Sequence, residues 1–366
     1  MTARTVSSDT TPSITFASNN GEVGGGEVML IRMADAARQA GWRTMILGPR
    51  GTGGVIDRAR REGHDVTDLA AGRRAYMREL RVWRHAHPGL LWCNGLVPAL
   101  ATAGQSDRVI HFHRLPRGVH RPAATLARRR AITTVVPSRF MAEHVHGADI
   151  LENWTDEPAG SFVRDRRRST DKSTRQPTAG LRIGYLGRWA HEKGVDLLLA
   201  AASSLGPESI SEVLLAGEER FGDADTTSSI REAMARSRVS VREVGWVAAP
   251  EIFAQVDVVV VPSRAPESFG LVAAEAMAHG LPVVVTDAGG LPEVVGPQHP
   301  WIARPDDADD LARTLGSVAA ARPQDLADTA MAGHQRWRDR YSPEAGTARM
   351  TEFLETLRPL SERTSR

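Results

Sequence analysis

The sequence contains a single cysteine, Cys93, among 366 residues, which excludes an internal disulfide and a cysteine-based metal cluster. Aromatic residues make up only 5% of the chain. The longest apolar runs, such as VDVVVVP at 256–262, have the length of a strand and fall far short of a membrane span. The first residues, MTARTVSSDTTPS, include no apolar stretch typical of a secretory signal. These absences predict a cytoplasmic protein and leave contact with a membrane surface open.

Lysine is also scarce, since the 46 basic residues include only Lys172 and Lys193. Lys172 lies in a polar stretch without periodic apolar residues, whereas Lys193 follows a predicted strand. In a chain that places arginine at nearly every basic position, Lys193 is a candidate functional residue, although chance placement remains the alternative. The net charge of +2 is too small to argue for a nucleic-acid partner.

The length favours two domains over a single core. Residues 166–180 are polar and charged, which predicts a linker between domain 1–165 and domain 181–340. On both sides of it, apolar strands alternate with helical stretches, and this pattern is typical of parallel sheets covered by helices. We therefore predict an α/β fold with two Rossmann-like domains facing a cleft. A C-terminal helix within 341–366 would cross back to the first domain. The predicted strands are 14–18, 43–49, 90–95, 109–113 and 133–138, then 182–187, 212–217, 257–263 and 282–287.

Ligands of doubly wound sheets bind where strands end and helices begin. The first such loop carries Gly24, Gly25 and Gly26 before a helix predicted from Val28. It does not fit G-x-G-x-x-G, because the last glycine position is occupied by Met29, so a nicotinamide cofactor is poorly supported. Three glycines in a row allow backbone amides to approach a phosphate or a sugar closely.

Two further loops carry charge. Arg188 and Lys193 follow the strand RIGYLG, and both could reach one anionic group. The stretch PESFGLVAAEAMAHG places Glu267 before a helix and Glu275 within it, with Ser268 as the expected N-cap and Phe269, Gly270 and Leu271 as donors of first-turn amides. On one helix, eight residues would separate the carboxylates by ~12 Å along the axis. Glycosidase carboxylates lie roughly 5–9.5 Å apart, so this spacing argues against hydrolysis and favours contacts along an extended ligand.

The stretch 267–293 resembles the E-x7-E signature of retaining GT-B glycosyltransferases of family 4. The similarity covers nearly the whole chain through the glycine-rich first loop, H-x-H in VIHFH, VVPSRFMAEHV, ENWTD, GRWAHEKG, VLLAGEE and VGWV. Each motif alone is weak, but their order across both domains is specific. The resemblance implies a metal-independent, front-face transfer of a sugar from a nucleotide diphosphate sugar, with a UDP-sugar as the most common donor.

The resemblance also assigns roles to single residues. Glu275 matches the residue that binds the ribose hydroxyls, and Glu267 matches the one that faces the transferred sugar. Arg188 and Lys193 match the pair that holds the diphosphate, with amide contacts from Ser268, Phe269, Gly270 and Leu271. Val247 matches the position that contacts the base, and His113 matches a histidine near sugar and acceptor, with His111 as the weaker choice. The implied catalytic residues are His113, Glu267, Arg188 and Lys193; the implied donor-binding set adds Gly24, Gly25, Gly26, Val247 and Glu275.

The acceptor is the least specified element. Arg114 stands where many relatives carry Asp, and Trp154 replaces the glycine of N-G-x-D, so Arg114, Asn153 and Trp154 are candidate acceptor contacts. We expect a small molecule or a secondary-metabolite scaffold, and a monomer or homodimer. An arginine-rich region at 114–130 leaves an anionic lipid or a phosphorylated acceptor open, although a solvated helix face is the ordinary explanation.

Two D-x-D matches, Asp223/Asp225 and Asp307/Asp309, lie in polar, loop-like stretches, so no metal and no cofactor is expected. Alternative functions for the predicted cleft are those of a transferase acting on a cell-envelope lipid or polysaccharide, of a nucleotide-sugar epimerase, and of an inactive binding scaffold. An inactive scaffold would be expected to lack Arg188, Lys193 or Glu275, and this chain retains all three. Most of the tryptophans are expected to pack in the cores.

Overall fold

The computed structural model describes residues 11–20, 24–51, 54–158, 180–217 and 224–364. The chain divides into two compact units. Unit 1 comprises Met1–Glu152 and Gly346–Arg366, and unit 2 comprises Asn153–Ala345. The boundary therefore lies at residue 152 instead of the predicted 165, and almost all of the predicted linker, 166–179, lies outside the described residues.

The sheet of unit 1 is parallel and has seven strands in the order β3-β2-β1-β4-β5-β6-β7. Ile14, Phe16 and Ala17 of the central strand β1 are completely or almost completely buried, as expected for a strand covered on both faces. The strands are β1 (Ser13–Ser18), β2 (Arg43–Pro49), β3 (Asp65–Leu69), β4 (Leu90–Asn94), β5 (Arg108–His111), β6 (Thr133–Val136) and β7 (Asp149–Ile150). The edge strands β3 and β7 were not predicted from the sequence.

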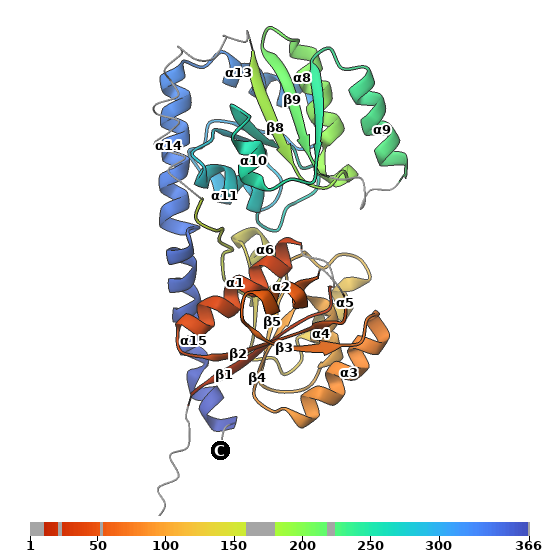
Figure 1. Ribbon diagram of the computed structural model, residues 1–366, viewed down its shortest axis with the longest axis vertical. Coiled ribbons are helices and arrows are strands. Elements are labelled where there is room, and N and C mark those ends of the chain that lie inside the picture. The colour runs from red at the N-terminus through yellow and green to blue at the C-terminus, as the bar shows by residue number, and fades with distance from the viewer. Residues whose placement is uncertain (1–10, 21–23, 52–53, 159–179, 218–223, 365–366) are drawn as a thin grey trace, which may run out of the picture. The chain divides into compact units, whose positions relative to one another are not determined.

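The helices of unit 1 connect these strands (Figure 1). Helix α1 follows β1 and has nine buried residues, seven of them apolar, which gives it the apolar face that covers the sheet. Helices α3, α4 and α5 pack against one another in sequence order. The helices are α1 (Gly25–Gln39), α2 (Val55–Arg61), α3 (Arg73–Ala86), α4 (Leu96–Ala101), α5 (His120–Ala127) and α6 (Arg139–His144).

Unit 2 contains a parallel six-stranded sheet in the order β10-β9-β8-β11-β12-β13. The run of four valines in β11 is central and buried, which explains why it lacks polar alternation. The strands are β8 (Leu181–Leu186), β9 (Ile210–Ala216), β10 (Ser240–Gly245), β11 (Val258–Val261), β12 (Val283–Thr286) and β13 (Ile302–Ala303). Of these, β10 and β13 were not predicted.

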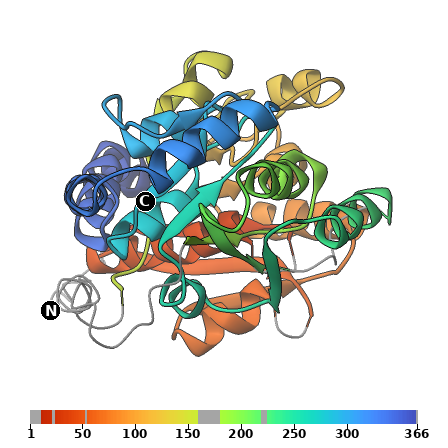
Figure 2. The same cartoon turned by 90° about the horizontal axis from the view of Figure 1, so that it is seen from above.

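Helices flank the second sheet, and α8 and α9 lie side by side next to its strands (Figure 2). One core layer contains Trp189, Leu198 and Val213, and the other contains Phe253, Val259 and Phe269. The helices are η1 (His191–Lys193), α8 (Val195–Leu205), α9 (Ala224–Ala235), α10 (Ala249–Phe253), α11 (Leu271–Ala278), α12 (Leu291–Val295), α13 (Ala308–Ala319) and α14 (Pro323–Arg340).

The C-terminal helix α15 (Pro343–Thr364) contributes most of its length to unit 1. There, Phe353 packs edge-on against Trp92 with ring centroids 5.7 Å apart, and the Arg358 guanidinium lies over the ring of Trp42. Both tryptophans are buried, so their role is core packing, as the sequence suggested. No helix among the described residues is both long and apolar enough to cross a membrane.

Candidate functional site

In unit 2, the loops after β8 and β11 bring Lys193 and Glu267 together. The Lys193 ammonium donates to Oε1 of Glu267 at 2.6 Å, and the Ser263 hydroxyl donates to the same oxygen at 2.6 Å. Both bonds use one carboxylate oxygen, so Oε2 of Glu267 receives none from the described residues. Because an ammonium carries three donors, Lys193 can keep this bond and still contact a second anionic group.

The pKa of Glu267 lies below its ordinary value. Burial alone would raise it, but the charge and hydrogen bond of Lys193 outweigh burial, with further help from Ser263 and the Arg188 charge. Glu267 is therefore an ionised carboxylate, and Arg188, Lys193 and Glu267 together carry a net positive charge, counted without the half-exposed Glu192 carboxylate that lies 3.6 Å from Arg188. A site of this charge favours an anionic ligand.

Arg188 is positioned through its backbone. The hydroxyl of buried Tyr185 donates to the Arg188 carbonyl oxygen at 2.7 Å, while the guanidinium lies 3.6 Å from the carboxylate of Glu192. Burial, together with the nearby charge of Glu267, raises the pKa of Tyr185, so its hydroxyl remains a donor. The Arg188 side chain keeps about a third of its surface exposed and can turn toward a ligand.

Arg264 joins the two loops that carry Lys193 and Glu267. Its guanidinium makes a bidentate ion pair with Asp196 at 2.6 Å and a third bond to Asp306 at 2.8 Å. Its backbone amide donates to the Glu192 carbonyl at 2.9 Å. Burial opposes ionisation of Asp196, but Arg264 outweighs it and lowers the pKa of that carboxyl. Arg264 thus fixes the chain on both sides of the cluster, a role that sequence reasoning missed.

The glycine pair after β12 allows the backbone of Glu267 to be held from both sides. The Glu267 amide donates to the Ala288 carbonyl at 3.1 Å, and the Gly290 amide donates to the Glu267 carbonyl at 2.8 Å. Gly289 has φ +68°, and a Cβ there would overlap the backbone of Glu267. This contact explains why the segment 266–290 combines a carboxylate, a buried strand and two glycines.

The start of α11 differs from the prediction. The N-cap is Gly270 instead of Ser268, and the first helical bond runs from Ala274 to the Gly270 carbonyl. Phe269 precedes the helix, and its buried ring packs edge-on against Tyr341, 5.3 Å between centroids. Of the predicted amide donors, only Leu271 lies in the first turn. Ser268 was predicted as the N-cap because serine is a preferred residue at that position. The structure has glycine there instead, because residue 270 adopts a positive φ that favours glycine.

Glu275 lies in helix α11 and Val247 follows strand β10, and their predicted contacts with the nucleotide stay predictions. Glu275 lies in the second turn of α11 and is half-buried. Val247 follows β10, where its half-buried side chain packs on the core while its neighbour Trp246 is 61% exposed. The segment therefore offers backbone atoms next to a large exposed ring.

In unit 1, the three glycines form the start of α1 instead of a preceding loop. Gly24 is the N-cap, and Gly25 and Gly26 are the first helical residues. The Glu27 carboxylate closes the helix start by accepting from the Gly24 amide at 3.2 Å and from the Ser18 hydroxyl at 3.3 Å. The pKa of Glu27 is raised by burial, which these hydrogen bonds only partly oppose. The amides of Gly25 and Gly26 are first-turn donors without partners inside the helix.

His113 is held next to this helix start by Asn94. The Asn94 amide nitrogen donates to the Gly26 carbonyl at 3.2 Å, and its oxygen lies 2.5 Å from Nε2 of His113. A carbonyl only accepts, so the Gly26 contact fixes which end of the Asn94 amide is the oxygen. Nε2 of His113 must then carry the proton.

Burial lowers the pKa of His113 to about 4, so the ring is neutral near pH 7. With Nε2 protonated, the lone pair of Nδ1 points away from Asn94 and receives no hydrogen bond from the described residues. The ring of His111 packs on His113 with centroids 3.8 Å apart. His111 is completely buried, and its pKa is well below the ordinary value because of burial and the neighbouring histidine. His113 is therefore the more accessible member of the pair.

The three candidate acceptor contacts belong to different units. Arg114 is exposed and belongs to unit 1, whereas Asn153 and Trp154 are 5% and 3% exposed and open unit 2. With so little surface, Trp154 is a core residue, and a direct acceptor contact by this ring is not supported. Asn153 retains a buried side-chain oxygen that accepts no bond within the described residues.

Possible metal ligands are already engaged. Asp307 is the N-cap of α13, where it accepts from the Asp310 amide at 2.8 Å; Asp223 of the other D-x-D match lies outside the described residues. A group not noticed in the sequence, Asp35, Glu62 and His64, has ligand atoms within 4.8 Å of one another. However, Asp35 pairs with Arg38 at 2.7 Å and Glu62 pairs with Arg58 at 2.8 Å. Both carboxylates of this group are therefore already ion-paired with arginines.

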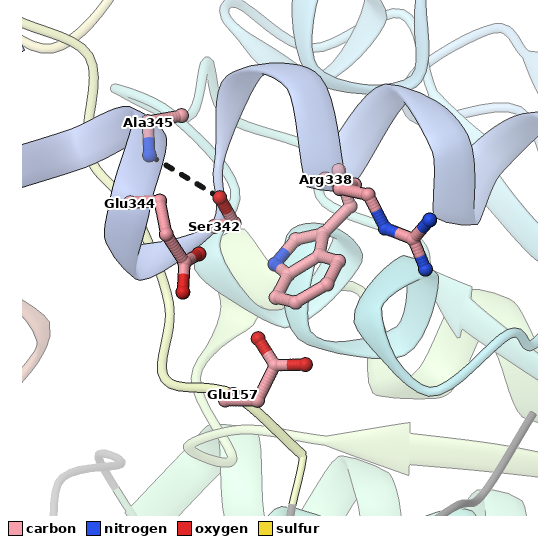
Figure 3. A pocket seen from close by; sticks show the side chains of 6 residues that line it. Glu157, Arg338, Ser342, Glu344 and Ala345 are labelled. Atoms are coloured by element: carbon pink, nitrogen blue, oxygen red, sulfur yellow. Dashed lines mark hydrogen bonds between the residues drawn. The ribbon is translucent and has the colours of Figure 1, made fainter. Parts of the chain in front are cut away.

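A separate pocket of about 350 Å³ lies at the junction of α14 and α15 in unit 2. Figure 3 shows the carboxylates of Glu157 and Glu344 pointing toward it. It is also lined by Trp337, Arg338, Ser342 and Ala345. None of the predicted site residues lines this pocket. Trp337 is almost completely buried and donates to Thr155 at 2.7 Å, so its ring serves the core.

Known proteins resemble this chain in sequence over part of its length and in structure over nearly all of it. Residues 180–320 match the family model described as "Glycosyl transferases group 1". D-inositol 3-phosphate glycosyltransferase of Segniliparus rotundus is 32% identical over 166 residues, which is 42% of this chain and 36% of that protein. Mannosylfructose-phosphate synthase of Agrobacterium fabrum is 36% identical over 142 residues, 36% of this chain and 31% of that protein. The matches to these curated relatives thus span about a third of their length.

Solved structures match over nearly the whole chain. HepE of Anabaena, in complex with UDP and glucose, superposes with a TM-score of 0.79 at 21% identity and covers 94% of this chain and all of that one. Sucrose-phosphate synthase of Thermosynechococcus elongatus gives a TM-score of 0.76 at 18% identity, covering 95% of this chain and all of that one. The architecture of two parallel-sheet units is therefore the GT-B fold, as predicted.

Proposed function

We propose that this protein is a glycosyltransferase that moves a sugar from a nucleotide diphosphate sugar to a hydroxyl group of an acceptor. The observation that carries the proposal is the positive cluster of Arg188, Lys193 and Glu267 at the strand ends of unit 2. The match of residues 180–320 to the glycosyltransferase family model supports it, because that segment contains the whole cluster.

The cluster suits the leaving group of such a reaction. Negative charge grows on the diphosphate as the glycosidic bond breaks, and cations already in place stabilise it without reorganisation. Lys193 would contact a phosphate oxygen while keeping its bond to Glu267, and Arg188 would add a planar fork. The amides of Leu271 and the following residues at the start of α11 would add partial positive charge.

The two glutamates would recognise the sugars. The free oxygen Oε2 of Glu267 can accept from a hydroxyl of the transferred sugar, and its negative charge favours positive character at the anomeric carbon. Glu275 would accept from the ribose hydroxyls, and the backbone at Val247 would contact the base. These roles follow from the family resemblance, and the half-buried position of each residue is compatible with them.

The neutral polar groups of unit 1 are suited to bind the acceptor. His113, with an unprotonated Nδ1, can accept a hydrogen bond from a hydroxyl without adding charge. The amides of Gly25 and Gly26 can donate to an oxygen of the sugar or of a phosphate. We further propose that transfer retains the anomeric configuration by a front-face route, needs no metal, and places the protein among the family 4 enzymes.

UDP is the proposed nucleotide, because HepE, which shares the fold, was crystallised with UDP and with UDP-glucose. For the acceptor we propose a small hydroxylated molecule. AviGT4, a glycosyltransferase involved in avilamycin A biosynthesis, also shares the fold with a TM-score of 0.61. The names of the sequence relatives include inositol phosphate and a sugar phosphate, which makes a phosphorylated small molecule the first class to screen.

Calorimetric titration with UDP, GDP and ADP, each with and without a chelator, tests the proposal. We expect one nucleotide, UDP, to bind with the same affinity in both conditions, and Glu275→Ala to weaken it. Incubation of the free UDP-sugar without acceptor separates a transferase from an epimerase, which would interconvert the sugar. Absence of binding by all three nucleotides would contradict the proposal and favour a binding scaffold.

A further inference from the structure

One face of unit 1 is strongly basic over three consecutive helices. The segment Arg73–Arg130 contains twelve arginines and only two acidic residues, Glu79 and Asp107, although the whole chain has a net charge of +2. Helices α3, α4 and α5 of this segment pack side by side and appear together along one side of the unit in Figure 1. We call this surface the α3–α5 face.

The basic side chains of the α3–α5 face are exposed and largely without acidic partners. The Glu79 carboxylate accepts a hydrogen bond from the Ala70 amide at 2.6 Å, and the Asp107 carboxylate accepts one from the Ser106 hydroxyl at 2.9 Å. Within the described residues, no carboxylate pairs with the exposed arginines, which are Arg73, Arg74, Arg78, Arg81, Arg114, Arg117, Arg121, Arg129 and Arg130.

Helix α2 and its surroundings provide the contrast within the same unit. Arg38, Arg58 and Arg60 each lie within 2.7–3.2 Å of a carboxylate, and Arg60 reaches both Asp57 and Asp68. Three arginines around α2 are therefore paired with carboxylates, whereas no exposed arginine of the α3–α5 face is paired in this way within the described residues. A solvated helix face normally carries charges of both signs, so the α3–α5 face requires another explanation.

Large apolar side chains protrude from the same face. Val82 of α3 is 66% exposed, Leu126 of α5 is 49% exposed, and Val119, directly before α5, is 83% exposed. Leu96, Val97 and Leu100 of the intervening helix α4 are half-buried. Since the three helices cover one side of the sheet, their exposed residues point away from it together.

We propose that the α3–α5 face docks on the surface of an anionic lipid bilayer. Arginines around protruding aliphatic side chains match such a surface, where basic groups bind the negative headgroups and aliphatic groups enter the boundary of the acyl chains. The contact is peripheral, since no described helix can cross a membrane. A folded nucleic acid has the same charge but offers no apolar layer for Val82, Val119 and Leu126. The proposal concerns where the protein works and is independent of its transferase activity.

Flotation with vesicles tests this proposal on the full chain. The probes are vesicles of phosphatidylcholine alone and vesicles containing one third phosphatidylglycerol, at low salt and at about 0.5 M salt. We expect binding to the anionic vesicles only, reduced at high salt because the Debye length shortens. Equal binding to both vesicle types, or no binding to the anionic vesicles at low salt, would overturn the proposal.

Two double variants locate the contact. Arg117→Ser with Arg121→Ser should weaken the partition constant about 30-fold, at ~1 kcal/mol per arginine. Val119→Asn with Leu126→Asn should also weaken the partition constant. In this variant, the binding that the wild type retains at high salt should disappear. The matched control, Arg313→Ser with Arg322→Ser in unit 2, removes the same charge from side chains that are 67% and 81% exposed, and should bind like the wild type.

If the control weakens binding as much as Arg117→Ser with Arg121→Ser, net charge alone drives the contact and the α3–α5 face is not its site. A soluble polyanion, heparin, should compete only weakly at equal charge concentration. Full displacement by heparin, combined with an unaffected Val119→Asn/Leu126→Asn variant, would favour a nucleic acid and contradict the lipid proposal.

Discussion

The two histidines at a strand end of unit 1 are neutral, whereas Lys193 and Glu267 at the strand ends of unit 2 form an ion pair. In unit 1, burial keeps His111 and His113 uncharged, and Asn94 connects His113 to the start of α1. In unit 2, burial opposes the charge of Glu267, but Lys193 and Ser263 reverse the effect. The same fold therefore supports one neutral and one charged site, depending on whether a cation lies next to the buried group.

The two sites also differ in how they are positioned. The cluster of unit 2 depends on close backbone contacts at glycines and on the bidentate pair of Arg264 with Asp196. The site of unit 1 depends on two hydrogen bonds of the Asn94 side chain, one with the Gly26 carbonyl and one with His113. A site that must hold charges needs rigid loops, because displacement by a fraction of an ångström changes a buried ion pair strongly. The following predictions test this difference, from the largest expected effect to the smallest.

Gly289→Ala should destabilise unit 2 strongly. The new Cβ would overlap the backbone of Glu267, and the residue must also hold φ +68°. Together, overpacking and backbone strain should reduce the free energy of unfolding by about 4 kcal/mol, as measured by urea denaturation. Gly245→Ala is the matched control, since it has φ +69° but no atom within 4 Å of its Cβ, and should cost only about 1 kcal/mol. Equal losses in the two variants would show that the close contact does not matter.

Stability should depend on pH through His113. Its pKa is about 4 in the folded protein and about 6.5 in an unfolded chain, so only the unfolded chain binds the proton between these values. The contribution of the neutral histidine is therefore complete above pH 6.5 and is lost as the pH falls toward 4. The loss should be about 3 kcal/mol.

Denaturation at pH 7 and pH 4.5 measures this effect. His113→Gln cannot take up the proton, so its stability should fall less between the two pH values than that of the wild type. An exposed histidine of the same unit, His120, supplies the matched control in His120→Gln. If His113→Gln and the wild type lose the same stability, the histidine is not held neutral by burial.

Asn94→Leu should have the smallest effect. It removes the acceptor for Nε2 of His113 and the donor to the Gly26 carbonyl, at a cost of about 1 kcal/mol each. We expect a rate of transfer roughly tenfold lower. Long-range proton–nitrogen spectra of histidine-labelled protein should show the Nε2-protonated tautomer of His113 in the wild type and a mixture in the variant. An unchanged tautomer would mean that Asn94 does not position His113.

Much of the fold could be predicted from the sequence. The nine predicted strands all exist, because long apolar runs between glycine-containing turns identify central strands. The four missed strands, β3, β7, β10 and β13, are short or lie at sheet edges with half-exposed or exposed residues. Their pairing depends on a neighbouring strand, which a local pattern does not contain.

The candidate site was only partly predictable. Lys193 was noticed because lysine is rare in this chain, and its structural position beside Glu267 agrees with a functional role. Arg264 and Asn94 were missed, since each acts through residues far away in the sequence. Ser263 lies only four residues before Glu267, but it matches no local motif. Asn94 ends the strand LLWCNG, and Ser263 follows the valine run of β11. Their positions at strand ends, where ligands bind, were the features that could have identified them in the sequence.

The most direct test of the central claim, that the charged cluster of unit 2 holds a diphosphate, compares UDP with uridine. Both are titrated against the wild type, Lys193→Ala and the surface control Arg322→Ser, with uridine followed by ligand-detected NMR. Loss of one preorganised cation should weaken UDP binding by about 3 kcal/mol, roughly 100-fold or more, and leave uridine unchanged. Equal affinities of the wild type and Lys193→Ala for UDP, or equal weakening of UDP and uridine, would contradict the account.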